Sequence, residues 1–107
     1  MDIGESERRS GNRFPIETAL EYKVILGENG AEFGSGQTIN LSSGGILFRS
    51  DRTLPQGVMI ELKIDWPASL SGTAGLILRV VGRTLRSEAT NSAVRILRHE
   101  FHTRKRP

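Results

Sequence analysis

The chain contains 107 residues and no cysteine, with 15 lysine and arginine residues against 12 aspartate and glutamate residues. This length suits one domain with a single core, and the absence of thiols excludes disulfides and thiolate metal sites. No apolar run approaches the roughly twenty residues of a membrane-spanning helix. The charged N-terminal segment does not have the pattern of a signal peptide. We therefore expect a cytoplasmic domain that does not insert into a membrane.

Residues 1–15 show no hydrophobic periodicity, which predicts a flexible N-terminal arm. The arm carries Arg8, Arg9 and Arg13, three guanidinium groups within six residues. Arginine outnumbers lysine twelve to three in the whole chain. Because the planar guanidinium group binds phosphates and guanine edges through paired hydrogen bonds, this bias favours a nucleotide partner. A soluble surface that happens to be rich in arginine explains the bias equally well.

Alternation of apolar and polar side chains predicts a first strand in residues 18–26, with Leu20, Tyr22 and Val24 on one face. The glycine-rich residues 27–36 follow and are predicted to form a hairpin loop. This loop lacks the Gly-Lys-Ser or Gly-Lys-Thr sequence of phosphate-binding loops and precedes a strand instead of a helix.

The clearest strand pattern covers residues 58–66 and is predicted to end at Pro67. A β-bulge is predicted at Gly82, because glycine interrupts the pattern of a later strand there. The remaining strands are predicted over residues 36–39, 46–48, 76–85 and 93–101. Six short strands without a helical period predict an all-β fold, and a six-stranded antiparallel barrel is favoured because closure removes exposed edges.

A polar turn at residues 40–45 lies between two of the predicted strands. Asn40 offers an amide, the two serines offer hydroxyl groups, and the two glycines can adopt positive φ and expose backbone N–H groups. Such a turn can bind an anion. The alternative is a hairpin whose Asn and Ser side chains only cap their own backbone.

Two motifs, one in the N-terminal arm and one in the polar turn, together resemble the signature of PilZ domains, which are bacterial receptors for cyclic di-GMP. The first is an Arg-x-x-x-Arg element at Arg9 and Arg13, just ahead of the first strand. The second is an Asn-x-Ser-x-x-Gly element at Asn40, Ser42 and Gly45. Each motif is weak alone, but their order, their spacing and the surrounding strands make the combination specific.

The resemblance implies a six-stranded antiparallel PilZ-like β-barrel over residues 16–103, preceded by the flexible arm and followed by a basic tail at residues 104–107. Many PilZ domains finish with a helix packed across the barrel. Only a few polar residues follow Phe101 in this sequence. Little or no C-terminal helix is therefore expected. Either the barrel end lacks this cover, or something else, such as a second copy of the chain, covers it.

The resemblance also implies a non-enzymatic cyclic di-GMP receptor without a metal ion or catalytic cofactor. It implies that Arg9 and Arg13 bind the nucleotide and that Asn40 binds a guanine edge or nearby polar groups. It further implies that Ser42 bonds to a phosphate or to the adjoining backbone, and that Gly45 lets the backbone approach the ligand. The arm is expected to close over the nucleotide and change a surface seen by an unidentified partner protein, and a homodimer is another expected assembly.

Arg8 precedes the Arg-x-x-x-Arg pair and adds one guanidinium group to the motif. In the PilZ family, an arginine at this position is associated with binding of cyclic di-GMP as an intercalated dimer. Two ligand molecules per chain are therefore expected. The alternative is that the Arg8 side chain points into solvent.

Two other binding functions remain open at this point. One is a small barrel for single-stranded nucleic acid that uses the basic C-terminal residues, and the other is a PilZ-like scaffold that binds protein and no nucleotide. Catalysis has little support, because a Ser-His-acid triad is recognised by geometry that the sequence does not show. His99 and His102 are expected on opposite faces of a strand, which disfavours a shared metal ion.

Overall fold

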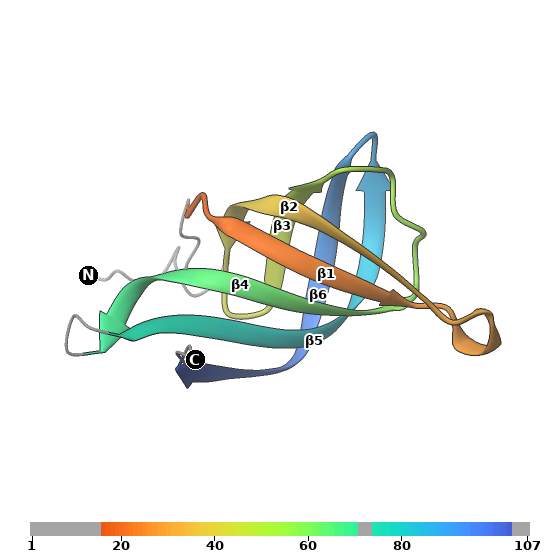
Figure 1. Ribbon diagram of the computed structural model, residues 1–107. Helices are drawn as coiled ribbons and strands as arrows, with labels where there is room; N and C mark the ends of the chain where they lie inside the picture. The colour runs from red at the N-terminus through yellow and green to blue at the C-terminus, as the bar shows by residue number, and fades with distance from the viewer. Residues whose placement is uncertain (1–15, 71–73, 104–107) are drawn as a thin grey trace.

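The structure, a computed structural model, describes residues 16–70 and 74–103, so the predicted arm and basic tail lie outside the described residues. This part of the chain contains six strands and one short 3₁₀ helix: β1 (Ala19–Ile25), η1 (Gly27–Asn29), β2 (Ala31–Leu41), β3 (Gly45–Ser50), β4 (Met59–Leu70), β5 (Ala74–Glu88) and β6 (Asn91–Thr103). Neighbouring strands are antiparallel, and the sheet closes into a barrel in the order β1-β2-β3-β6-β5-β4 (Figure 1). The predicted six-stranded antiparallel barrel is confirmed.

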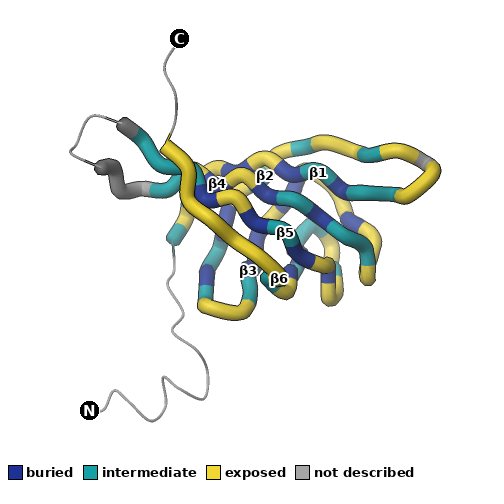
Figure 2. Tube along the Cα trace, turned by 90° about the horizontal axis from the view of Figure 1, so that it is seen from below, coloured by how far each residue is buried: buried dark blue, intermediate teal, exposed yellow. Residues whose placement is uncertain are grey.

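Alternate apolar residues of the strands fill the inside of the barrel. Leu20, Tyr22 and Val24 of β1 are buried, while the charged residues between them are not (Figure 2). The rings of Tyr22 and Phe48 pack against each other with their centroids 6.3 Å apart. The other buried apolar residues are Leu41, Ile46, Leu54, Ile60, Leu62, Ile64, Leu78, Val80 and Val94. Since the core takes one face of each strand, binding groups must come from the outer face and the strand ends.

The predicted hairpin loop at residues 27–36 is wrong in its second half, which belongs to β2. Gly34 and Gly36 allow close packing there and do not form a turn. A Cβ atom on Gly34 would overlap the ring of Tyr22, and one on Gly36 would overlap the carbonyl oxygen of Arg49. Glycine within a strand often marks such a close approach of another group.

The predicted end of a strand at Pro67 is also wrong, since β4 continues to Leu70. Pairing between β1 and β4 stops at Ile64. Pro67 falls in the register shift between Trp66 and Ser69 where β4 pairs with β5. A proline lacks the N–H group that a central strand needs but is tolerated at an edge or a bulge. β4 continues through the proline because β5 is its one neighbour there among the described strands.

A β-bulge does occur beside Gly82, but the extra residue belongs to β6. Val81 pairs with Arg98 and Gly82 pairs with Ile96, which leaves Leu97 without a partner in β5. A Cβ atom on Gly82 would overlap the backbone of β6. The glycine therefore marks a close approach of the two strands, and the bulge at Leu97 follows its partner Ile96 directly along β6.

Candidate functional site

The predicted polar turn joins β2 to β3 and is closed by hydrogen bonds between Ser42 and Gly45. The backbone N–H of Ser42 donates to the carbonyl oxygen of Gly45 over 2.9 Å. The N–H of Gly45 donates to the Ser42 Oγ over 3.2 Å, and this hydroxyl donates to the Gly45 carbonyl oxygen over 3.3 Å. Ser42 therefore stabilises the turn with its own side chain, which is the capping arrangement that the sequence left open.

Gly44 and Gly45 do not have the positive φ angles that their place in the turn suggested. The described glycines with positive φ are Gly27, Gly30 and Gly57. No heavy atom lies within 4 Å of the position that a Cβ atom on Gly44 would take. At Gly45 this position is 3.1 Å from the carbonyl oxygen of Val94. Gly45 therefore keeps β3 close to β6, while Gly44 faces open space.

Asn40 lies near the end of β2 on the outer side of the barrel. A bulge between Thr38 and Asn40 sets this orientation, because Thr38 pairs with Phe48 and Asn40 pairs with Leu47. Thr38 and Leu41 are buried, whereas Asn40 and Leu47 are half-buried. The amide of Asn40 is thus presented next to the Ser42–Gly45 turn.

The described chain begins against Thr38, two residues before Asn40 in β2. The hydroxyl of Thr38 donates to the carbonyl oxygen of Ile16 and accepts from the N–H of Thr18 over 2.9 Å. The N–H of Thr38 donates to the carbonyl oxygen of Thr18 over 2.9 Å, and the Thr18 hydroxyl donates to the carbonyl oxygen of Asp65 over 2.7 Å. The residues that follow the predicted arm are therefore held against β2 and β4 next to the motif.

Strand pairing brings two arginines to the outer face beside Gly45. Gly45 pairs with Arg95 of β6, and Arg95 pairs with Arg83 of β5. Both arginines are exposed. The guanidinium group of Arg83 donates to the carbonyl oxygen of Gly57 over 2.9 Å, whereas that of Arg95 has no ion pair or hydrogen bond within the described part of the chain. Arg95 is therefore available for a ligand.

An apolar strip separates Asn40 from a third arginine, Arg86 of β5. Asn40 pairs with Leu47, Leu47 pairs with Ala93, and Ala93 pairs with Arg86. Leu47 and Ala93 are half-buried, and Arg86 is exposed. An apolar surface with an amide and guanidinium groups around it suits a planar ligand that carries negative charge. We call the outer surface formed by these strands the motif face; its residues are Asn40, Gly45, Leu47, Arg83, Ala93 and Arg95.

The sequence alone did not indicate that Arg83 and Arg95 belong to the candidate site on the motif face. Their positions next to the buried residues Thr84 and Val94 indicate that they point outward. The sequence does not indicate that β6 lies beside β3, because these strands are far apart in the chain. Their neighbourhood with Gly45 becomes visible once the barrel is closed.

The PilZ domain family model matches residues 7–106, which is nearly the whole chain. The chain belongs to the PilZ domain family. Domains of this family are in general non-enzymatic receptors for cyclic di-GMP. No curated protein matches the chain. The predicted ligand residues Arg8, Arg9 and Arg13 fall within the matched range but outside the described residues.

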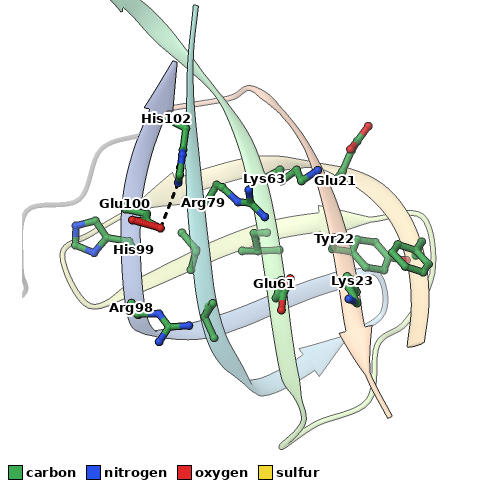
Figure 3. Close-up of a pocket in the computed structure, with 14 residues that line it drawn as sticks. Glu21, Tyr22, Lys23, Glu61, Lys63, Arg79, Arg98, His99, Glu100 and His102 are labelled. Carbon is green, nitrogen blue, oxygen red and sulfur yellow. Dashed lines mark ion pairs between the residues drawn. The ribbon is translucent and has the colours of Figure 1, made fainter. Parts of the chain in front are cut away.

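A hollow of about 530 Å³ lies elsewhere on this PilZ domain, on the outer face of β1, β4, β5 and β6 (Figure 3). The Nε2 atom of His102 lies 3.2 Å from a carboxylate oxygen of Glu100 in its wall. The charged side chains that line the hollow have both signs and include Glu21, Lys23, Glu61, Lys63, Arg79, Arg98 and Glu100. No residue of the motif face lines this hollow. Because its charges are mixed, the hollow is a poorer anion site than the motif face.

A hydrogen bond between Tyr22 and Asp51 ties the interior of the PilZ barrel to the loop after β3. The Tyr22 hydroxyl donates to the Oδ1 atom of Asp51 over 2.5 Å, and Arg52 donates to Oδ2 over 3.4 Å. Burial, with a further contribution from Asp51, raises the pKa of Tyr22 to about 12. The hydrogen bond from Tyr22 lowers the pKa of Asp51. Because these three side chains form hydrogen bonds with one another, their role is structural.

The histidines of this PilZ domain are not placed to share a metal ion. His99 pairs with Val80 and His102 pairs with Ile77, so the two histidines lie on opposite faces of β6, as predicted. Within residues 16–70 and 74–103, no group of three or more histidine, aspartate or glutamate side chains could hold a metal ion. The same residues contain no helix that is long and apolar enough to cross a membrane.

Proposed function

We propose that this chain is a cyclic di-GMP receptor that binds the nucleotide on the motif face. One observation carries the proposal: the Asn-x-Ser-x-x-Gly motif meets Arg95 and Arg83 on one outer surface, beside the first described residues of the chain. Cyclic di-GMP has two phosphates and two guanines. Guanidinium groups bind both of these groups, and the apolar strip offers a surface to the planar base.

Arg9 and Arg13 complete the proposed site from the arm. Ile16 is held by Thr38, and the three residue-to-residue steps from Arg13 to Ile16 span at most about 11 Å, so Arg13 is within reach of Asn40. In DNA, a paired arginine–guanine contact contributes about 1–3 kcal/mol of discrimination. Ordering a free residue costs on the order of 1–2 kcal/mol. The proposed arm therefore closes only when it gains contacts to the ligand and the barrel together.

The barrel residues have distinct roles in the proposed site. Asn40 binds a guanine edge, and Arg95, which lies beside the apolar strip next to Gly45, binds a phosphate or a guanine. Gly45 lets the ligand approach the backbone of β3, since its missing side chain leaves the surface beside Arg95 uncovered. Ser42 acts through the turn, whose shape it maintains by its bonds to Gly45.

Arg8 sets the proposed stoichiometry. An intercalated dimer of cyclic di-GMP carries four phosphates, so it has room for a third arm guanidinium group in addition to those of Arg9 and Arg13. We expect two nucleotide molecules per chain, with Arg8 in contact with the second one.

The proposed signal is a change of surface. When the arm closes over the motif face, a partner protein meets the arm and the nucleotide in place of the open strands. The nucleic-acid alternative is not favoured, because Tyr22 and Phe48 are buried and Trp66 packs against the core and Phe101. The described residues therefore offer few exposed rings for base stacking.

Isothermal titration calorimetry with cyclic di-GMP, and with a short oligothymidylate at two salt concentrations, tests the proposal. We expect saturable binding of cyclic di-GMP with a stoichiometry near two, and the Arg8→Leu variant should move this value toward one. Salt-sensitive oligonucleotide binding without cyclic di-GMP binding at micromolar concentration would contradict the receptor function. Saturation of the wild type at one ligand would contradict the role of Arg8 alone.

A matched pair of arginine variants tests where the nucleotide lies. Arg95→Ala should raise the dissociation constant for cyclic di-GMP about tenfold, which corresponds to about 1.4 kcal/mol. Arg79→Ala removes the same charge from an exposed site in the hollow and should leave the dissociation constant nearly unchanged. Equal effects of the two variants would show that arginine acts only through the overall charge.

A further inference from the structure

One edge of β6 has no neighbouring strand over its second half. β3 pairs with residues 91–95 of β6, and the last contact on that side is the N–H of Ile96, which donates to the carbonyl oxygen of Gly44 over 3.0 Å. From Arg98 to Thr103, β6 pairs with β5 and with no other described strand. Figure 2 shows this stretch as a continuous exposed segment at the side of the barrel. A free edge of this kind is a template for another strand.

The side chains along this edge form a palindrome of chemical type around His99. Arg98 and Glu100 flank it with opposite charges. Leu97 and Phe101 come next, and they are 53% and 48% exposed, two of the four large apolar residues that the described surface exposes most. Charged residues usually protect an edge because they repel an identical edge. Here the signs are opposite about the centre, so two antiparallel copies of this edge attract each other.

We propose that the β6 edge pairs with the same edge of a second copy of the chain, antiparallel and about a two-fold axis at His99. In this register, His99 faces His99 of the second copy. Arg98 faces Glu100 of the second copy, and Leu97 faces Phe101, each pair occurring twice because the interface is isologous. Opposite charges and apolar groups that lie directly across from each other are the pairs that stabilise antiparallel sheets.

The neighbouring registers are less favourable. An axis at Glu100 places this carboxylate against its own copy, and an axis at Arg98 places two guanidinium groups together; like charges directly opposite are destabilising. Only the axis at His99 pairs both charges and both apolar residues. This self-complementarity favours a second copy as the occupant over a strand of an unrelated protein.

Cysteine cross-linking of the full chain tests the register, because the protein has no cysteine of its own. Opposite residues in an antiparallel pair have Cα atoms about 4.5–5.5 Å apart, which a disulfide can span. His99→Cys should therefore form a disulfide-linked dimer under mild oxidation. His102→Cys is the matched control, since in this register its two copies lie about six positions apart along the strands and should cross-link far less. Equal cross-linking of the two variants, or none of either, would overturn the proposal.

Charge reversal tests the interface without a covalent bond. Sedimentation velocity over a concentration series should show a monomer–dimer equilibrium of the ligand-free wild type. Arg98→Glu and Glu100→Arg should each raise the dimer dissociation constant about tenfold or more, and the double variant should restore it. Lys63→Glu, an exposed charge on β4, should have little effect. A wild type that stays monomeric at high concentration, or a double variant without rescue, would overturn the proposal.

Discussion

Ser42 stabilises the turn between β2 and β3, a structural role that the motif alone did not reveal. Its hydroxyl accepts from the N–H of Gly45 and donates to the carbonyl oxygen of the same residue. A role in the turn and a role in ligand binding therefore cannot be separated by a loss of binding alone. The stability of the ligand-free protein has to be measured beside the affinity.

We predict that Ser42→Ala lowers the free energy of unfolding by about 1 kcal/mol, the usual contribution of such bonds. In a domain of this size this corresponds to a melting temperature lower by about 5 °C. The variant should also bind cyclic di-GMP more weakly, because the turn loses its shape. The neighbouring exposed Ser43 offers the matched control, Ser43→Ala, which should change neither quantity. Thermal unfolding and calorimetry check both, and equal behaviour of the two variants would contradict the role of Ser42.

Tyr22 gives the fold a dependence on alkaline pH. Its pKa is raised to about 12 by burial and by the bond to Asp51, against an ordinary value of 10.0. A folded-state pKa above the unfolded one means that the neutral hydroxyl stabilises the fold below pH 10, and that this contribution is lost as the pH rises toward 12.

We predict that wild-type stability falls more steeply between pH 10 and pH 12 than that of Tyr22→Phe, which has no phenol to ionise. At neutral pH the variant should be the less stable of the two, because it loses the bond to Asp51. Chemical unfolding across this pH range measures the difference. Parallel pH curves for the two proteins would show that the hydroxyl is not held as described.

At the scale of the strands, local patterns were readable and long-range pairing was not. The alternation around Leu20 and Tyr22 predicted which residues face the core, and the motif predicted the position of the turn at Ser42. Gly34 was wrongly predicted to lie in a loop. A glycine stands there because the ring of Tyr22, a residue in another strand, leaves no room for a side chain. Arg95 was not among the predicted ligand residues, because its proximity to Gly45 depends on a pairing between strands that are distant in sequence.

We predict that Gly82→Ala destabilises the barrel by about 2 kcal/mol or more, because the new Cβ atom would overlap the backbone of β6 and a methyl group of Val94. Gly44→Ala is the matched control, since nothing lies within 4 Å of its Cβ position. This second change should stay within about 0.5 kcal/mol of the wild type. Urea unfolding checks both variants. A well-tolerated Gly82→Ala would show that β5 and β6 can separate at this point.

At the scale of the whole molecule, two outer surfaces of the described residues compete as the place for the nucleotide. The motif face carries the family motif with arginines from β5 and β6 beside it, and the first described residues lie next to it. The hollow over β1, β4, β5 and β6 has a volume of about 530 Å³ but a lining of mixed charge. We assign the nucleotide to the first surface because its charge and hydrogen-bonding groups match those of cyclic di-GMP.

A nitrogen–proton correlation NMR titration of the full chain with cyclic di-GMP distinguishes these two surfaces most directly. We predict that the backbone signals of Asn40, Ser42, Gly45, Leu47 and Arg95 shift on binding. Signals from the hollow, such as those of Glu61, Lys63 and Arg79, should stay close to their positions in the free protein. Shifts confined to the hollow, with the motif face unchanged, would contradict the proposed site.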